Sequence, residues 1–276
     1  MSRKRQRLPL STECAVIEKF SHDGRGLARI NGKTTFIEGA LPGEQVHFQY
    51  TRKKNDFDEG RVVSIDTFAS SRVEPRCPHY NLCGGCSLQH LDEQAQIHEK
   101  QNLLLDLLRR IGHCEPEAIL QPLHSTSWHY RNKARLSVRH VLKKQAVLVG
   151  FREKNNPRFI TEINQCPVLN AKIDAQIPNL RALIESFDKP SAIAQIEVAA
   201  GDEEIALIFR NLELLSSLDE EKLQKFGLDS GFRIYLQPGG IDSIELFYPQ
   251  GLSEFISYDL PEESIRFQFH PTDFTQ

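Results

Sequence analysis

The chain has 276 residues and a mass of 31.5 kDa, and its 39% apolar and 26% charged residues are ordinary for a globular protein. It has no apolar run near the roughly 18 residues that a membrane helix needs, and its basic N-terminus lacks the apolar stretch of a signal peptide. These features exclude membrane and secreted proteins, so we expect a cytoplasmic protein without structural disulfides.

The formal net charge of -3 hides an uneven distribution. Residues 123–160 contain nine Lys or Arg against one acid, Glu153, whereas residues 201–276 contain five Lys or Arg against fifteen Asp or Glu. A solvated surface usually mixes the two signs, so this basic segment suggests a polyanionic partner.

The N-terminal part is predicted to be a disordered basic tail over residues 1–12 and a small β-barrel over residues 13–70. Five short β-like runs occur there: CAVIEKF, GLARI, TTFIEG, EQVHFQYTR and GRVVSIDTF. Asn31-Gly32 between two runs indicates a hairpin. Five such strands suit an OB-like barrel, which tracks nucleic acid with basic and aromatic side chains, although a purely structural barrel is an alternative. The candidate RNA-binding residues are Arg25, Arg29, Arg52, Lys53, Lys54 and Phe57.

Residues 71–91 form a cysteine-rich loop, and a linker with one long helix follows over residues 92–122. Asp92 is suited to cap the start of this helix, and Arg109 and Arg110 suit its end before Gly112. Its apolar stripe recurs at helical spacing and consists of Ile97, Leu104, Leu108 and Ile111.

Residues 123–270 are predicted to form an antiparallel α+β domain. Its strands are expected at RNKARLSVRHVL, AVLVGFRE, RFITEI, AQIEVAAG, EEIALIFR, FRIYLQPG, IELFYP and IRFQFHP. Helices are expected over residues 167–187 and near LDEEKLQKFGL. The fold class of the whole chain is therefore mixed β and α+β.

Three cysteines stand close together in CPHYNLCGGC, where Cys77, Cys83 and Cys86 have the spacing C-x5-C-x2-C. The Gly-Gly pair between the last two lets the backbone fold closely around a bound centre. A fourth ligand is predicted at Cys166, since proline follows it directly, as proline follows Cys77.

A site of four thiolates suits zinc or an iron–sulfur cluster. Zinc sites usually combine two matched pairs of closely spaced cysteines, whereas this chain offers a triplet and a distant single residue. The spacing therefore favours iron and sulfur, while zinc and unligated thiols stay open as alternatives.

Four motifs follow the barrel in this order: CPHYNLCGGCSLQHL, HYRNKARLSV, VGFREKNNPRFITEINQCPVL and FQFHPTDFTQ. Together they resemble the bacterial 23S ribosomal RNA uracil-C5 methyltransferases over essentially the whole chain. The resemblance implies a TRAM barrel at residues 13–70, 23S rRNA as the partner, and a structural [4Fe-4S] cluster in place of zinc. It implies that Cys77, Cys83, Cys86 and Cys166 ligate that cluster.

The chemistry of this family needs a nucleophilic cysteine and a Rossmann-like domain for S-adenosylmethionine. The thiolate adds to C6 of uracil, C5 then attacks the methyl group, and a base removes the C5 proton. The chain has no GxGxxG-like loop after a strand, and Cys14 and Cys114 match no part of the nucleophile motif. We therefore expect that the Rossmann-like domain is absent, that no catalytic residue is present and that the chain is inactive alone.

The last residues, 271–276, resemble the start of the methyltransferase domain. The resemblance implies that Phe274 borders the RNA base and that Gln276 contacts S-adenosylmethionine. It also implies that the linker helix packs on the catalytic domain, so its apolar stripe is predicted to be less buried than its pattern demands.

Alternating basic residues in HYRNKARLSV are the candidate contacts to RNA phosphates, namely Arg131, Lys133 and Arg135. The simpler interpretation is that they only keep an exposed sheet face soluble. Two other functions stay open: a fragment of a tRNA uracil-C5 methyltransferase, and a non-catalytic, zinc-bound RNA-binding module.

Overall fold

The structure, a computed structural model, describes residues 11–273 and divides into two compact units. Unit 1 comprises Met1–Pro75 and Cys86–His124, and unit 2 comprises Arg76–Gly85 and Ser125–Gln276. The short segment 76–85 therefore belongs to the unit that the C-terminal half builds. Within the described residues, every helix is too short or too polar to cross a membrane.

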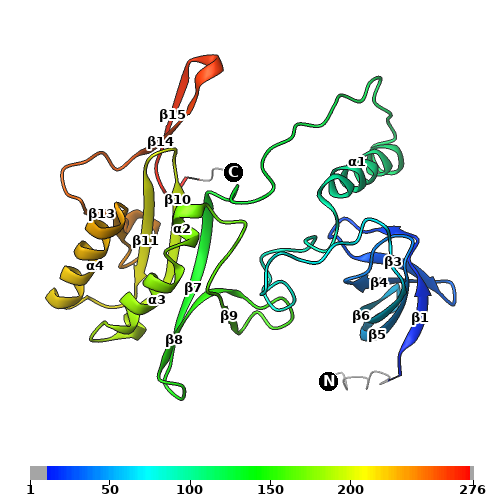
Figure 1. Ribbon diagram of the computed structural model, residues 1–276, viewed down its shortest axis with the longest axis horizontal. Helices are drawn as coiled ribbons and strands as arrows, with labels where there is room; N and C mark the ends of the chain where they lie inside the picture. The colour runs from blue at the N-terminus through cyan, green and yellow to red at the C-terminus, as the bar shows by residue number, and fades with distance from the viewer. Residues whose placement is uncertain (1–10, 274–276) are drawn as a thin grey trace. The chain divides into compact units, whose positions relative to one another are not determined.

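Unit 1 contains a mixed sheet of six strands in the order β1-β5-β6-β4-β3-β2, followed by one long helix (Figure 1). Strands β4 and β6 run parallel, and the other neighbours run antiparallel. The elements are β1 (Glu13–Val16), β2 (Lys19–Phe20), β3 (Gly26–Ile30), β4 (Lys33–Glu38), β5 (Gln45–Lys53), β6 (Phe57–Thr67) and α1 (Glu93–Arg110). Inward-facing side chains form the core: Ala15, Ile17, Ala28, Ile37, Ala40, Val46, Phe48 and Tyr50.

The predicted five-stranded barrel is wrong. The run CAVIEKF divides into β1 and β2, because β1 pairs with β5 and β2 pairs with β3. The change of partner occurs at Ile17 and Glu18, whose N–H groups donate to the carbonyls of Glu44 and Leu27. No strand pairing among residues 11–273 joins β1 to β2, so these elements form a six-stranded mixed sheet and not a closed barrel.

The predicted hairpin at Asn31-Gly32 is confirmed. Asn31 and Gly32 have φ values of 50° and 79°, and they connect the antiparallel strands β3 and β4. Two successive positive φ values match the right-handed twist of the flanking strands, and Asn and Gly tolerate them best.

Helix α1 begins and ends as the sequence predicts. The Asp92 side chain caps its start by accepting hydrogen bonds from the N–H groups of Gln94 and Ala95. None of its 18 residues is buried, and the Leu104 side chain is 56% exposed. The apolar stripe is thus less buried than its pattern demands, as predicted.

Unit 2 contains a sheet of seven strands in the order β13-β12-β11-β10-β7-β8-β9 and a separate two-stranded hairpin, β14-β15. Its strands are β7 (Lys133–Val141), β8 (Ala146–Arg152), β9 (Ile160–Glu162), β10 (Ile193–Ala200), β11 (Ile205–Asn211), β12 (Arg233–Leu236), β13 (Glu245–Tyr248), β14 (Ile256–Leu260) and β15 (Ile265–Phe269). Its α-helices are α2 (Ala171–Asp174), α3 (Ile177–Glu185) and α4 (Ser217–Ser230).

The predicted antiparallel character of this sheet is also wrong, because β11 and β12 run parallel. Parallel neighbours need a crossover, and α4 supplies it in the segment where the sequence predicted a helix. The helix predicted over residues 167–187 is instead two helices, α2 and α3. Pro178 stands in the first turn of α3, where a missing N–H costs nothing, and proline favours a new helix start there.

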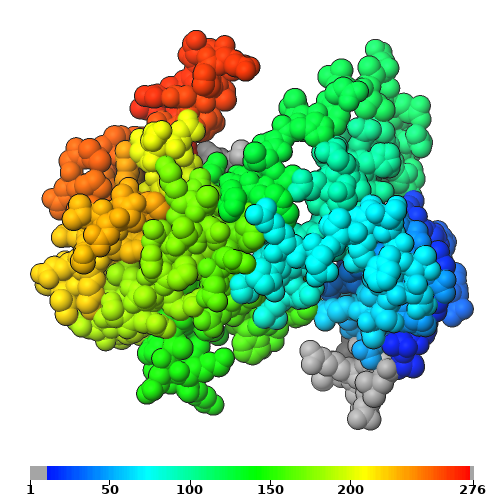
Figure 2. Space-filling view, viewed as in Figure 1, coloured from blue at the N-terminus to red at the C-terminus, as the bar shows by residue number. Residues whose placement is uncertain are grey.

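The seven-stranded sheet is covered on both faces. Figure 1 shows α2, α3 and α4 on one face, toward which Leu207 and Phe209 of β11 point. Ala206 and Ile208 of the same strand pack on the other face with Phe269 of the hairpin. Burial on both faces explains the unbroken apolar run IALIF. The tip of the β14-β15 hairpin projects from the rest of unit 2 (Figures 1 and 2).

A buried ion pair holds the end of the unit 1 sheet. The Glu44 carboxylate is fully buried and accepts hydrogen bonds from Arg72 at 2.6 and 2.8 Å and from the Leu41 N–H at 2.8 Å. Burial alone would raise the pKa of Glu44, but the hydrogen bonds from Arg72, Leu41 and Ala69 outweigh it and lower the pKa below 4.5. A lowered pKa stabilises the fold above about pH 4.5, and this contribution disappears as pH falls through the folded-state pKa.

We expect Glu44→Gln to lower the free energy of unfolding of unit 1 by roughly 1–3 kcal/mol at pH 7, because buried donors lose their charged acceptor. The difference from the wild-type value at pH 7 should shrink in acid, once pH has fallen through the lowered pKa of Glu44 and its carboxyl is protonated. Urea unfolding at both pH values measures this. Glu115→Gln, at an exposed ion pair with Arg109, is the control and should change stability by less than about 0.5 kcal/mol. A constant difference at both pH values would contradict the role of the charge.

Candidate metal centre and nucleic-acid interface

The loop that carries Cys77 and Cys83 is tightly folded within unit 2. The Tyr80 N–H donates to the Cys77 carbonyl at 3.1 Å, and the Cys83 N–H donates to the His79 carbonyl at 2.8 Å. These bonds close two successive turns between Cys77 and Cys83. Cys83 is buried, and Cys77 is partly buried.

The same loop pairs with the segment that follows β8. Cys83 forms an isolated antiparallel bridge with Glu153, the Gly84 N–H donates to the Arg152 carbonyl at 2.9 Å, and the Lys154 N–H donates to the Leu82 carbonyl at 2.9 Å. A Cβ atom on Gly84 would lie 2.9 Å from the Arg152 carbonyl oxygen, so only glycine allows this approach. Gly84 therefore allows the loop to pack against the end of β8, whereas the predicted close fold of the Gly-Gly pair around a bound centre stays a prediction.

Cys166 lies in unit 2 as well, shortly after β9, and is buried. Its N–H donates to the Asp174 carboxylate, and its carbonyl accepts from Leu169 at 2.9 Å. The Asn164 N–H donates to the His79 ring nitrogen at 3.4 Å, which joins the segment before Cys166 to the turn between Cys77 and Cys83. Two cysteine-bearing segments, about 90 residues apart, thus lie side by side.

Thiolates are the ligands that an iron–sulfur cluster takes, and cysteines supply that donor type here. Three of the four predicted ligands, Cys77, Cys83 and Cys166, belong to unit 2, whereas Cys86 belongs to unit 1. The site of four cysteines therefore stays a prediction. The Gly85 N–H donates to the Cys83 sulfur at 3.4 Å, and such a donor stabilises a thiolate ligand. The other two cysteines, Cys14 and Cys114, are exposed and lie in unit 1.

Strand β7 presents its basic residues on one face. Arg135 and Arg139 alternate with the buried Leu136 and Val138, as the period of a strand requires. The Arg135 side chain is 67% exposed and pairs with Glu197 at 2.9 Å.

The other two predicted phosphate contacts are less available. The Lys133 ammonium donates to the Asp273 carbonyl, and burial lowers the pKa of Lys133 although Glu197 and Asp273 act against it. Arg131 is partly buried, and its N–H donates to the Val168 carbonyl at 2.8 Å. Of the three predicted residues, Arg135 is the most exposed.

A hollow of about 610 Å³ in unit 2 joins the basic strand to the cysteine loop. Its lining includes Gly84, Gly85, Arg135, Ser137, Arg152 and Lys154. Cationic residues from β7, from the end of β8 and from the segment after it thus line one concave surface. Arg152 and Lys154 belong to the basic segment at residues 123–160 but were not predicted as contacts, because only the β7–β8 pairing brings them beside Arg135.

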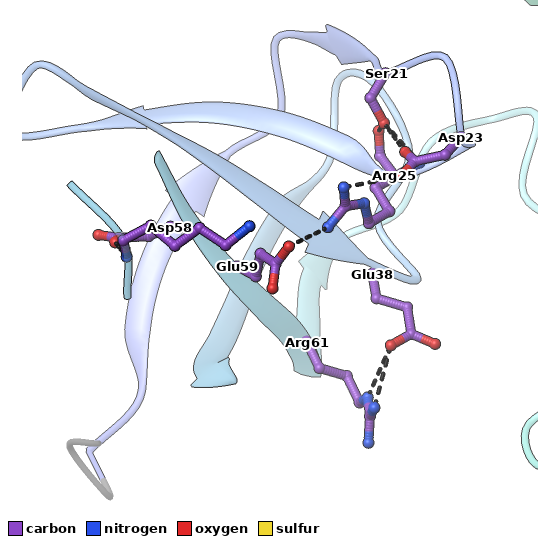
Figure 3. Close-up of polar contacts among 8 residues, drawn as sticks. Ser21, Asp23, Arg25, Glu38, Asp58, Glu59 and Arg61 are labelled. Carbon is purple, nitrogen blue, oxygen red and sulfur yellow. Dashed lines mark hydrogen bonds and ion pairs between the residues drawn. The ribbon is translucent and has the colours of Figure 1, made fainter. Parts of the chain in front are cut away.

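The unit 1 candidates divide into engaged and exposed residues. Arg25 lies over the Phe36 ring at 4.8 Å and pairs with Asp23 at 2.8 Å and with Glu59 at 3.4 Å (Figure 3). This network engages the two terminal guanidinium nitrogens of Arg25, whereas its buried Nε has no hydrogen-bond partner among the described residues.

Arg52 and Lys53, at the end of β5, are exposed, and the Lys53 ammonium lies 3.8 Å from the centre of the Tyr50 ring. They keep the role of candidate RNA contacts. Phe274 and Gln276, the predicted base and cofactor contacts, lie outside the described residues.

Residues 9–63 match the TRAM domain, in agreement with the resemblance found in the sequence. The chain is 59% identical over all 276 of its residues to the 23S rRNA (uracil(1939)-C(5))-methyltransferase RlmD of Legionella pneumophila strain Lens. It is 46% identical over the same length to the RlmD protein of Alcanivorax borkumensis. In both comparisons the chain spans 62% of the relative's length.

Among solved structures, the chain is similar to the Pyrococcus abyssi tRNA (uracil-54, C5)-methyltransferase in complex with S-adenosyl-L-homocysteine. The TM-score is 0.64 at 22% identity, and the match covers 95% of this chain and 61% of that one. At this identity the likeness shows the fold alone.

This likeness corrects the prediction that a Rossmann-like methyltransferase domain is absent. Nearly the whole chain follows the fold of a methyltransferase, so the missing glycine-rich motif does not support that absence. The prediction failed because GxGxxG describes only one form of cofactor loop, and its absence excludes little.

Proposed function

We propose that this chain supplies the RNA-binding and cluster-binding part of an S-adenosylmethionine-dependent methyltransferase that forms 5-methyluridine in 23S rRNA. The observation that carries the proposal is the hollow of unit 2, where Arg135, Arg152 and Lys154 surround the glycines of the cysteine loop. Similarity to the RlmD proteins over the full chain supports the choice of 23S rRNA as substrate. A reducing, cytoplasmic location suits a protein whose buried cysteines serve as thiolate ligands.

The metal centre in this proposal is a [4Fe-4S] cluster on Cys77, Cys83, Cys86 and Cys166. The bound cluster supplies a structural cross-link between the loop at residues 77–86 and the segment after β9, and it takes no part in methyl transfer. The hydrogen bonds of His79 and Gly84 support this role, because they join the loop to the segments after β9 and at the end of β8.

RNA binding in this proposal begins with phosphate contacts. Arg131, Lys133 and Arg135 in unit 2, together with Arg52 and Lys53 in unit 1, neutralise phosphates and so position the RNA. We assign Phe274 to the target base and Gln276 to S-adenosylmethionine in the whole protein, as the family resemblance implies.

A tRNA substrate is the second candidate, because the similar solved structure is a tRNA methyltransferase. Fluorescence anisotropy with a 23S rRNA fragment around uridine 1939 and with an unmodified tRNA separates the two. We expect the rRNA fragment to bind at least about tenfold tighter at matched salt. Phosphate contacts alone would bind both RNAs with equal affinity, so such a difference reports selection beyond the phosphate contacts. Equal affinities would contradict selection of rRNA, and a preference for tRNA would favour the second candidate.

A further inference from the structure

Three potential metal ligands meet on the outer face of the unit 1 sheet, and none belongs to the cysteine loop. The thiol of Cys14, a ring nitrogen of His47 and a carboxylate oxygen of Asp66 all lie within 4.8 Å of one another. They come from β1, β5 and β6, which are neighbouring strands at one edge of the sheet (Figure 1).

The strand register explains why these side chains converge. Cys14 of β1 lies directly opposite His47 of β5. Their neighbours Ala15 and Val46 are buried in the core, so by alternation Cys14 and His47 point outward.

Asp66 joins them because of an irregularity between β5 and β6. Gln45 pairs with Thr67 and Val46 pairs with Ile65, which leaves Asp66 as the additional residue of a β-bulge. Its neighbour Ile65 packs on the core, so Asp66 points to the outer face by alternation. The Asp66 carboxylate consequently lies 3.0 Å from His47 Nε2.

The donor set indicates which cation fits. A thiolate, an imidazole and a carboxylate are the ligands that Zn²⁺ combines, whereas Mg²⁺ and Ca²⁺ prefer sites made of oxygen alone. Zinc bonds of about 2.0–2.3 Å require tetrahedral ligands to be about 3.3–3.8 Å apart, so the observed separations need only small side-chain movements. The three side chains would leave the fourth coordination position of a tetrahedral zinc ion open to water.

A neighbouring side chain supports the sulfur ligand. The Gln45 amide donates to the Cys14 sulfur at 3.5 Å, as outer groups do when they orient a metal ligand. An ion pair alone would explain why His47 and Asp66 lie together. It would not explain the position of the Cys14 thiol beside them or the hydrogen bond that this thiol accepts from the Gln45 amide.

We propose that Cys14, His47 and Asp66 bind one Zn²⁺ ion on the outer face of the unit 1 sheet. Binding releases the thiol proton of Cys14 and joins three strands by metal bonds. The edge strand β1, which pairs with β5 alone among the described strands, gains a second attachment to β6.

Alkylation of individual thiols tests this proposal on the full chain. Iodoacetamide labelling is followed by peptide mass spectrometry, with and without Zn²⁺. We expect saturating zinc to slow labelling of Cys14 by about tenfold or more, because metal-bound sulfur is no longer a free thiolate. Cys114, an exposed thiol of the same unit, is the internal control and should react at an unchanged rate.

Variants of the carboxylate and imidazole make the test specific. Asp66→Asn and His47→Ala should each abolish the protection, whereas Asp56→Asn, at an exposed acid of the β5–β6 turn, should retain it. The proposal is overturned if zinc protects neither thiol or both thiols equally. It is also overturned if protection survives Asp66→Asn.

Discussion

Replacing Cys166 by serine is expected to remove nearly all iron from the protein. A cubane cluster takes one thiolate per iron, and serine is a poor substitute for a thiolate. Protein purified without oxygen should contain about four iron atoms per wild-type chain and fewer than about one in the variant. Iron analysis and the visible absorption of the cluster measure this loss.

Cys114→Ser is the matched control, because it removes an exposed thiol of unit 1 and should leave the iron content unchanged. If Cys166→Ser also kept its iron, the fourth ligand would lie elsewhere. A colourless wild-type protein with one zinc ion in the cysteine loop would instead favour the zinc-bound RNA-binding module.

Neutralising the hollow of unit 2 is expected to weaken RNA binding strongly. In the double variant Arg135→Gln, Arg152→Gln, two side chains that line the hollow lose their charge. For single-stranded RNA, two lost phosphate contacts reduce the slope of log K against log salt by about 1.4, which corresponds to about 25-fold lower affinity at 0.1 M salt. Binding isotherms at several salt concentrations measure both quantities.

Lys225→Gln provides the comparison for this variant. Lys225 is an exposed cation of unit 2 that pairs with Asp229 on the acidic helix α4. Its removal should change neither affinity nor slope. An unchanged salt slope in the double variant would show that Arg135 and Arg152 only keep the sheet face soluble.

Local patterns in the sequence predicted the local elements well. The Asp92 cap, the Asn31-Gly32 hairpin and the alternation of Arg135 with Leu136 depend on neighbours within a few residues, and the structure confirms all three. The prediction that Cys166 joins the cysteine loop came from the proline that follows both Cys77 and Cys166 and from the family resemblance, and it stays a prediction.

The features that the sequence did not predict depend on pairing between strands that lie far apart in the chain. The division of CAVIEKF into two strands follows from a change of partner at Ile17, and the parallel pair β11–β12 follows from how α4 returns the chain. The bulge at Asp66 follows from the register with β5. Patterns along a single strand carry no information on these pairings, so the six-stranded sheet and the outer-face ligands were not predicted.

The membership of segment 76–85 in unit 2 has a consequence for how the protein is made. The ribosome releases this segment well before the stretches at residues 152–154 and 164–166 that bond to it. At roughly 5–20 residues per second, its thiols wait for several seconds without these backbone partners. Under the proposed function, insertion of a cluster held by Cys166 would therefore have to follow translation of that residue.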